Sequence, residues 1–300
     1  MANQEVLAVD LGQSGSRIKQ GALVITSDRG KLVGESPLAS LRAIFESTQK
    51  LSADVVSLSC TGFNGVVTNP ESFAALCAEY FGASKVAVID DGLAGYVGAL
   101  NGRNGVVLSI GGGVVAVGGN NGKFAHRDGL GSTFGDEGGG FWLGKNAITK
   151  VLGIRQGRGD DQEMLDYFAD ECAAFDALEV KNAAEASTLA IRTAKKVLDA
   201  ADAGVSTATA IVDEGAYLLA QTVVATWYGC GGTKADSPEI VIQGGAARNA
   251  TYATKIALEI NAKLPNAVIA QSGGDNLDGA TWIANNLRHD APPLLLWAGL

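Results

Sequence analysis

Short apolar runs and amphipathic segments alternate along the first hundred residues of the chain. Apolar runs that end at a glycine or an acidic residue predict buried strands, and apolar residues at helical spacing predict helices. This alternation is typical of an α/β domain. In this chain, the second strand is expected to form a hairpin with the first. Strands are expected at residues 6–9, 17–25, 31–33, 55–59 and 85–89, and helices at residues 37–50, 70–81 and 91–100.

The second part of the chain begins in the same order as the first. A polar, glycine-rich turn at residues 101–105 is followed by a strand at 106–110, a glycine turn, and two more strands at 114–117 and 123–126. Strand, glycine turn, strand, turn and strand therefore open both halves. The repeat predicts two related α/β domains, each of which presents a glycine turn to a shared cleft.

The rest of the chain is mostly helical before the alternation returns. The expected elements are helices at 161–174, 183–201, 207–228, from the double glycine to 261, and at 276–286, with strands at 239–242 and 267–270. We predict an N-terminal domain at residues 1–103 and a C-terminal domain with a helical insertion at 104–285. A last helix near 286–300 is expected to pack on the N-terminal domain.

Composition excludes several classes of protein. The chain has 300 residues, a net charge of −9 and 47% hydrophobic residues, which fits folded domains and argues against a nucleic-acid partner. No apolar run is long enough to span a bilayer, so we expect a cytoplasmic protein without a membrane partner. The cysteines form no CxxC pair, so reduced thiols are expected at Cys60, Cys77, Cys172 and Cys230.

The most informative segment is the glycine-rich run at residues 129–144. Glycines surround the adjacent acids Asp136 and Glu137, and apolar residues follow at helical spacing. Glycine permits positive φ and close approach of the backbone to a ligand. The run is either a flexible surface loop before a capped helix or a loop that binds a ligand.

Two glycine turns are candidates for phosphate binding. In the first, Asp10 stands at a strand end before glycines and small hydroxyl residues, where a carboxylate can hold hydrated Mg²⁺ and turn amides can meet phosphate oxygens. The second has three consecutive glycines at 111–113, one more than a two-residue hairpin loop needs. A plain hairpin and a wide β-bulge are the respective alternatives.

Two further strand ends carry candidate residues. Asp90 and Asp91 stand at a strand-to-helix junction, where one can cap the helix and the other can act as a general base toward a substrate hydroxyl. Gly244 and Gly245 follow a buried strand, where they either let a flat ring such as adenine lie close to the backbone or serve only packing.

In this order, these segments resemble the sugar kinase and actin-like ATPase superfamily. Within it, almost the whole chain is similar to the N-acetylglucosamine kinase branch, which is grouped with BadF/BadG/BcrA/BcrD-type ATPases. Residues 135–138 with Phe141, Trp142 and Gly144 carry the most specific part of the resemblance. It implies an α/β fold of two actin-like (ribonuclease H-like) domains, with a nucleotide- and sugar-binding cleft between them.

The resemblance also implies a set of site residues. ATP would be bound by the positions that match the phosphate and adenosine motifs, which are Asp10, Gly12, Ser14, Arg17, Gly111, Gly112, Gly113, Gly244, Gly245 and Asn249. Asp10 would also hold Mg²⁺. The sugar would be bound by Thr61, Gly62, Asp91, Gly135 and Asp136. Asp91 falls on the position of the family's catalytic aspartate.

The implied activity is ATP-dependent transfer of the γ-phosphoryl group to a hydroxyl of an amino sugar, N-acetylglucosamine or glucosamine. Asp91 would accept the hydroxyl proton, and closure of the two domains would exclude water. The implied partner is a small-molecule sugar. Trp227, Tyr228 and the apolar tail 294–297 would serve a homodimer contact as readily as a core.

The chain departs from the family pattern at two places. The second phosphate motif of the family carries a Thr and a Ser where this chain has Gly112 and Val114, so phosphate binding would depend on backbone amides. Residues 34–37 replace an Asn that touches the sugar in hexosamine kinases, which leaves the identity of the sugar open. The alternatives are a BadF-type ATPase that acts as a conformational switch and a catalytically weak sugar-binding protein.

Overall fold

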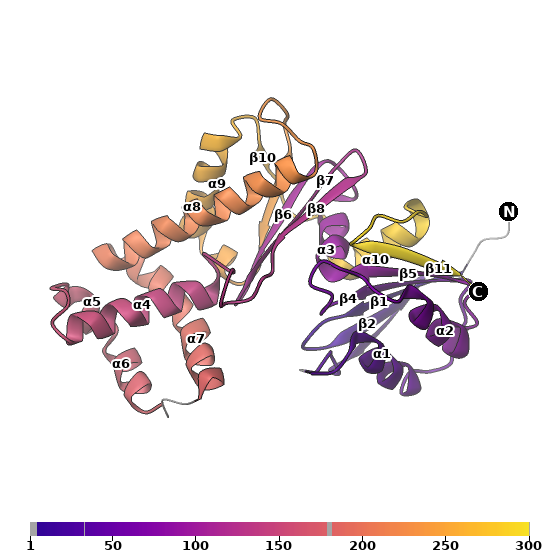
Figure 1. The fold of residues 1–300 in the computed structure, drawn as a ribbon, viewed down its shortest axis with the longest axis horizontal. Helices are drawn as coiled ribbons and strands as arrows, with labels where there is room; N and C mark the ends of the chain where they lie inside the picture. The colour runs from indigo at the N-terminus through magenta and orange to yellow at the C-terminus, as the bar shows by residue number, and fades with distance from the viewer. Residues whose placement is uncertain (1–4, 33, 179–181, 300) are drawn as a thin grey trace.

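The chain folds into two lobes that meet at a pair of crossed helices (Figure 1). The computed structural model describes residues 5–32, 34–178 and 182–299. The N-terminal lobe holds a six-stranded sheet with α1 and α2, and the C-terminal lobe holds a five-stranded sheet with α4 to α9. This mixed architecture of two sheets and surrounding helices confirms the predicted fold class.

Three parallel strands form the centre of the N-terminal sheet. The strand order is β11-β5-β4-β1-β2-β3, in which β1, β4 and β5 are parallel. The strands are β1 (Val6–Leu11), β2 (Ser16–Gln20), β3 (Leu23–Ser27), β4 (Val55–Cys60), β5 (Lys85–Asp90) and β11 (Leu295–Gly299). Cys60 is paired with both Leu11 and Asp90, so the segments that follow the three strands begin side by side at one sheet edge.

The C-terminal sheet brings two glycine turns together in a similar way. Its order is β10-β9-β6-β7-β8, with β6 and β9 parallel and paired through Ser109 and Gln243. The turn after β6 and the turn after β9 therefore lie next to each other. The strands are β6 (Gly105–Ile110), β7 (Val114–Asn120), β8 (Lys123–Asp128), β9 (Glu239–Gln243) and β10 (Val268–Ile269).

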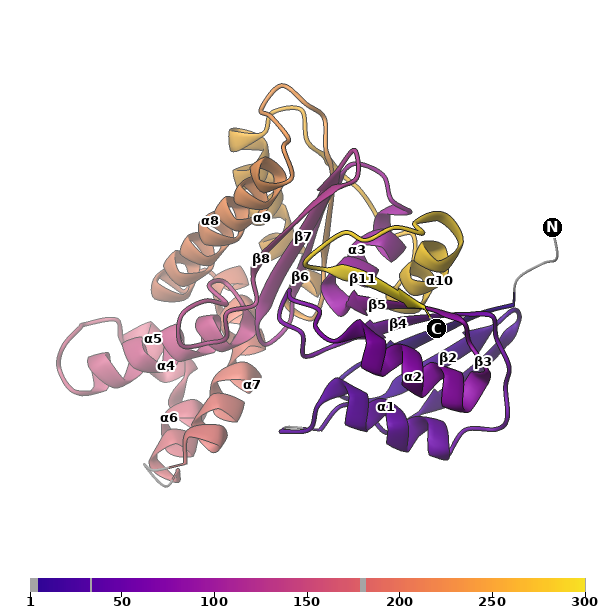
Figure 2. The same ribbon diagram turned by 45° about the vertical axis from the view of Figure 1, so that its right-hand side comes forward.

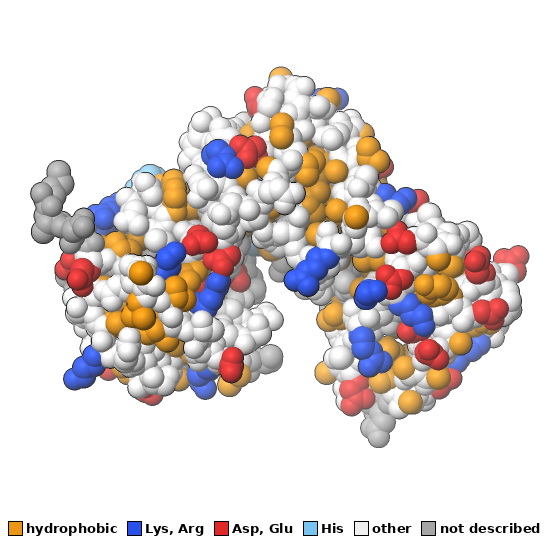
Figure 3. Space-filling model, turned by 180° about the vertical axis from the view of Figure 1, so that it is seen from behind, with side chains coloured by type: hydrophobic (Ala, Val, Ile, Leu, Met, Phe, Trp, Pro, Cys, Tyr) orange, Lys and Arg blue, Asp and Glu red, His pale blue; other side chains and the backbone are white. Residues whose placement is uncertain are grey.

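Helices cover both faces of each sheet. Alternate strand residues face α1 and α2 on one side of the first sheet and α10 on the other, and the second sheet lies between α8 with α9 and α3. The helices α4 to α7 extend from the C-terminal lobe, and a deep notch separates them from the N-terminal lobe (Figure 3). The bounds are α1 (Pro37–Glu46), α2 (Pro70–Phe81), α3 (Asp91–Leu100), α4 (Gly140–Arg155), α5 (Gln162–Tyr167), α6 (Ala169–Asp176), α7 (Ala183–Asp202), α8 (Ser206–Gly229), α9 (Ala250–Lys263) and α10 (Asn276–Asn286).

The helices α3 and α10 cross between the two sheets (Figure 2). They approach so closely that a Cβ on Gly279 would overlap the carbonyl oxygen of Ala94, and a Cβ on Gly98 would overlap that of Asp275. The Asp275 side chain begins α10 with a capping box that it forms with Asp278. Glycine at these two helix positions is therefore required by the packing of the junction.

Two short predicted strands differ from the structure. The segment predicted as one strand at 17–25 is two antiparallel strands, β2 and β3, which are joined by a turn at Gly21 with φ of +57°. Lys31 and Leu32 of the strand predicted at 31–33 lie outside any strand, and residue 33 lies outside the described residues.

The predicted helix 161–174 is divided at Phe168 into α5 and α6.

The prediction of a last helix near residues 286–300 is wrong. The chain leaves α10 after Asn286, passes Pro292 and Pro293, and forms β11, which pairs antiparallel with β5. Two prolines break a helix, the few residues that remain are too short for a new one, and the open edge of β5 offers hydrogen bonds instead. The domain boundaries at 103 and 285 stay a prediction.

We predict that Gly279→Ala lowers the free energy of unfolding by about 2 kcal/mol or more, because the added methyl group forces α3 and α10 apart. Gly153→Ala in α4 is the matched control, since its Cβ would meet only Arg158 atoms at 3.8 Å. That substitution is expected to leave stability unchanged or to raise it by up to about 1 kcal/mol. Urea unfolding curves of both variants and the wild type measure the difference, and equal effects would contradict the close crossing.

Candidate functional site

Two cavities lie on either side of the glycine turn that joins β6 and β7. The first has a volume of about 420 Å³, and we call it the junction cavity because residues of both lobes line it. They include Gln13, Thr61, Gly62, Asn64, Asp90 and Asp91 before the turn, and Gly111, Gly113, Val114, His126 and Asp136 from the turn onward. The second has about 590 Å³ and lies against α7, so we call it the α7 cavity. Its lining includes Gly111, Gly112, Ile191, Ala194, Leu198, Gly245, Arg248 and Asn249.

Asp90 and Asp91 have separate roles at the start of α3. Asp90 is the N-cap, and its two carboxylate oxygens accept hydrogen bonds from the amides of Gly92 at 3.0 Å and Gly65 at 2.9 Å. Asp90 therefore fastens the loop after β4 to the helix. Asp91 is the acid that is left to face the cavity, where a hydrogen bond from Thr61 reaches its carboxyl group.

Burial dominates the electrostatics of Asp91. It raises the pKa of this carboxyl to about 6, and the negative charges of Asp90 and Asp10 act in the same direction, while the hydrogen bond from Thr61 opposes them. A carboxyl group with a pKa near neutrality, within a cavity, suits general base catalysis.

Asp10 at the end of β1 is held by Arg17. The Arg17 guanidinium donates to Asp10 Oδ2 at 2.6 Å and also to the carboxylate of Asp275, while Ser59 Oγ donates to Asp10 Oδ1 at 3.2 Å. The Arg17 ion pairs thus connect the first strand to the N-terminus of α10. Each Asp10 carboxylate oxygen therefore accepts one hydrogen bond. The second lone pair of each oxygen is left to bind a further donor.

The glycine turn at 111–113 exposes backbone donors between the two cavities. Its carbonyl oxygens accept from the first amides of α4, since Gly140 N binds Gly111 O at 2.9 Å and Phe141 N binds Gly112 O at 2.8 Å. The amides of Gly112 and Gly113 have no hydrogen-bond partner in the described part of the chain. Two free amides next to each other can bind an anion.

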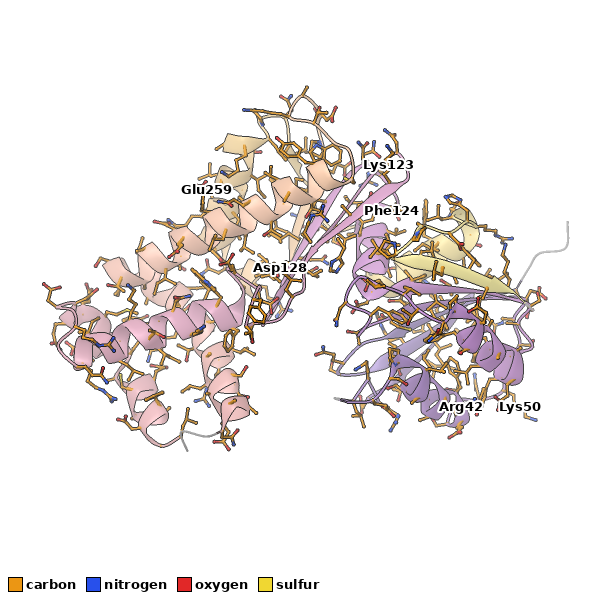
Figure 4. The ribbon with its side chains drawn as sticks, viewed as in Figure 1. Arg42, Lys50, Lys123, Phe124, Asp128 and Glu259 are labelled. Carbon is orange, nitrogen blue, oxygen red and sulfur yellow. The ribbon has the colours of Figure 1, made fainter. Side chains whose placement is uncertain are left out.

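The run at 129–144 is held by hydrogen bonds at Asp136 and Gly138. Asp136 adopts a positive φ of +60°, donates from its amide to Asp128 Oδ1 at 2.9 Å, and accepts from the amide of Val114 at 2.9 Å. The Tyr252 hydroxyl donates to the carbonyl of Gly138 at 2.8 Å. Asp128 is the last residue of β8, and Lys123 and Phe124 stand at the other end of the same strand (Figure 4). The pKa of Asp136 is raised by burial, against the effect of the Val114 hydrogen bond.

Packing explains two more residues of the motifs. A Cβ on Gly144 of α4 would overlap the carbonyl of Ala190 in α7, so this glycine allows the two helices to touch. Gly244 has a φ of +105° and lies against the backbone of Ile110, which requires glycine, whereas no atom of the described residues lies within 4 Å of the Cβ position of Gly245. Gly245 therefore leaves open space at the α7 cavity.

The structure gathers most of the predicted site residues around the two cavities. The junction cavity receives Thr61, Gly62, Asp91, Gly111, Gly113 and Asp136, and the α7 cavity receives Gly111, Gly112, Gly245 and Asn249. Asn249 also caps α9, where it accepts from Tyr252 N at 2.8 Å. The predicted residues that line neither cavity are Asp10, Gly12, Ser14, Arg17, Gly135 and Gly244.

Sequence reasoning missed several lining residues. Ile191, Ala194 and Leu198 lie in the helix expected at 183–201, for which no site role was predicted, yet they form the apolar wall of the α7 cavity. Their helical spacing is the same for a core face and for a cavity face, so the sequence carries no signal that separates the two. Gln13 lies between the predicted residues Gly12 and Ser14 but was not itself singled out, and Asn64 comes from a turn without any distinguishing pattern.

Comparisons with known proteins show the family to which the chain belongs. The sequence profile of the BadF/BadG/BcrA/BcrD ATPase family matches residues 11–281, so the chain belongs to that family, and membership implies the use of ATP. Among curated proteins, none matches the sequence. Within the described residues, no helix is long and apolar enough to cross a membrane.

The fold is similar to that of several solved sugar kinases. A provisionally named N-acetylglucosamine kinase from Chromobacterium violaceum has a TM-score of 0.61 at 19% identity, over 92% of this chain and 97% of that one. Another from Porphyromonas gingivalis has a TM-score of 0.60 at 13% identity, over 94% and 99%. A ROK hexokinase from Thermus thermophilus has a TM-score of 0.56 at 15% identity, over 94% and 98%.

The raised pKa of Asp91 predicts a pH-dependent change in stability. The folded state holds this proton more tightly than the unfolded chain, so the contribution of Asp91 to the free energy of unfolding falls as the pH rises from the ordinary value of 3.8 past about 6. Asp91→Asn removes this loss, and the variant is expected to exceed the wild type in stability by roughly 2–3 kcal/mol near pH 8.

Thermal and urea unfolding between about pH 4.5 and 8 check this expectation, with the advantage of the variant shrinking toward the acid end. The exposed Asp160→Asn is the control and is expected to show no such trend. A constant difference between Asp91→Asn and the wild type over this range would contradict the assigned pKa.

Proposed function

We propose that this protein is an ATP-dependent sugar kinase, which transfers the γ-phosphoryl group to a hydroxyl of an amino sugar, N-acetylglucosamine or glucosamine. One observation carries the proposal: Gly111 lines both cavities, so the junction cavity and the α7 cavity meet at a turn with free amides. A phosphoryl group at this turn can reach an acceptor in one cavity while its nucleotide occupies the other.

Asp91 is the proposed general base. The acceptor hydroxyl binds its carboxylate, which accepts the proton as the oxygen attacks phosphorus and the bond to the leaving ADP breaks. The hydrogen bond from Thr61 orients the carboxyl group. Asp136 has one oxygen bound to the amide of Val114, so its other oxygen is the one proposed to accept a hydrogen bond from the sugar.

The α7 cavity is the proposed nucleotide site. Its wall of Ile191, Ala194 and Leu198 offers an apolar surface for adenine, and the open space at Gly245 allows a flat ring to lie against the backbone. The free amides of the glycine turn would bind phosphate oxygens.

Asp10 fits a hydrated Mg²⁺ that is held through water. Arg17 and Ser59 each occupy one lone pair of its oxygens, and Mg²⁺ keeps several waters in phosphate sites. Bound there, Mg²⁺ would neutralise charge on the phosphates. Direct coordination by Asp10 Oδ2 would require the Arg17 guanidinium to move.

A slow ATPase that acts as a conformational switch is the second candidate. It is favoured by the replacement of two hydroxyl residues by Gly112 and Val114, since the Val114 side chain is buried and its amide is bound to Asp136. The turn then stabilises the transferring charge with fewer donors. A catalytically weak sugar-binding protein is favoured by the same observation.

A homodimer stays a proposal, although the buried Trp227 belongs to the core.

We predict that Asp91→Asn lowers kcat for the sugar-stimulated release of ADP by about 10²- to 10⁴-fold, because the general base is lost. N-acetylglucosamine, glucosamine and glucose are compared in a coupled assay with MgATP, and Asp160→Asn serves as the control. Nucleotide binding should persist in Asp91→Asn. Nucleotide binding by the wild type without stimulation by any sugar would favour the ATPase switch.

Gly245→Leu is predicted to abolish nucleotide binding while the protein folds normally. The φ of Gly245 is −61°, which any residue adopts, and a leucine side chain there would occupy the space beside the backbone where the adenine ring is proposed to lie. ATP should therefore raise the unfolding temperature of the wild type but not of the variant. The unfolding temperature without ATP should be the same for both, and an ATP-induced rise of equal size would place the nucleotide elsewhere.

A further inference from the structure

His126 lies where the two lobes meet, on the side of the C-terminal sheet. It belongs to β8 and is paired with Val117 of β7. A Cβ on Gly65 would lie 3.2 Å from its Cγ and Nδ1 atoms, and a Cβ on Gly92 would lie 3.6 Å from its Cδ2 atom. The imidazole of one lobe therefore packs against the backbone of the loop after β4 and against the start of α3.

The ring of His126 also lines the junction cavity, together with Asp91. Neither ring nitrogen makes a hydrogen bond to the described residues. By contrast, the acids nearby already have hydrogen-bond partners, since Asp90 accepts from two backbone amides and Asp136 accepts from one. The imidazole thus has hydrogen-bonding capacity that no described residue uses, at a position that lines the cavity.

Its surroundings favour the neutral imidazole. Burial lowers the pKa of His126 and Arg127 acts in the same direction, against the opposing charges of Asp90 and Asp128. A neutral imidazole carries one N–H donor and one acceptor nitrogen. Whichever nitrogen faces the ligand can pair with a hydroxyl or an acetamido group, because each of these groups both donates and accepts hydrogen bonds.

We propose that His126 is an acceptor-binding residue, which hydrogen-bonds a hydroxyl or acetamido group of the sugar that does not react. The inference rests on the proposed kinase function and adds a specificity-determining contact to it. Asp91 binds the reacting hydroxyl at the start of α3, and His126 binds a second group of the same ring from β8. The sugar would then contact both sides of the junction cavity.

His126→Phe tests this contact, because phenylalanine keeps a flat ring at the junction and removes both ring nitrogens. The KM for the sugar is expected to rise by about 10-fold or more, as for a lost hydrogen bond in a buried site. The KM for ATP and the unfolding temperature without ligands should stay at the wild-type values. His126→Gln, which retains a donor and an acceptor, should recover part of the loss.

The control is His289→Phe, which changes the only other histidine of the chain at an exposed position outside the cavity. An unchanged KM for the sugar in His126→Phe would overturn the inference while the kinase function stands. Equal changes in both KM values with a lower unfolding temperature would show a packing role and also overturn it. If no sugar stimulates ADP release or raises the unfolding temperature of the wild type, the kinase function itself fails, and the inference fails with it.

Discussion

The close crossing of α3 and α10 is the constraint on which the rest of the structure depends. Gly98 and Gly279 allow the backbones of the two helices to touch between the sheets, and the Asn276 side chain donates to the carbonyl of Asp91 at 3.2 Å. Since Asp91 is the first residue of α3, the packing that joins the lobes also sets the position of the proposed base. Arg17 extends this connection to Asp10 through its ion pair with the N-cap of α10. The residues that pack α3 against α10 therefore also hold Asp91 and Asp10 in position.

A second constraint acts at the glycine turn after β6. The first amides of α4 hold its carbonyl oxygens, and Asp136 lies so close to Gly113 that a side chain there would collide with the carboxylate. The glycine-rich run at residues 129–144 thus holds the turn in place. Two amides at the boundary of the two cavities then have no partner among the residues that the structure describes. A rigid turn with free donors needs little rearrangement when it binds a phosphoryl group, which is the kind of preorganisation that phosphoryl transfer requires.

The sequence predicted the fold class and the positions of most strands and helices, because apolar runs and glycine turns mark them locally. It failed for β11, since strand pairing with β5 depends on a partner two hundred residues away. Within the site, the pair Asp90 and Asp91 was recognised as one cap and one base, and the resemblance pointed to Asp91 as the base. The contact of Asp90 with Gly65, which ties the loop after β4 to the helix, depends on tertiary packing and was not predicted. The apolar wall on α7 and the location of His126 depend on tertiary packing, which no local pattern contains.

The central claim is that the two cavities hold a nucleotide and a sugar at the same time, with the glycine turn between them. The most direct test is a crystal structure with a non-hydrolysable ATP analogue, Mg²⁺ and the amino sugar. We expect the γ-phosphoryl group at the amides of Gly112 and Gly113, and a sugar hydroxyl bound to Asp91 at about 3–3.5 Å from the phosphorus in an in-line geometry. A γ-phosphoryl group that points away from the junction cavity, or a sugar bound elsewhere, would contradict the account.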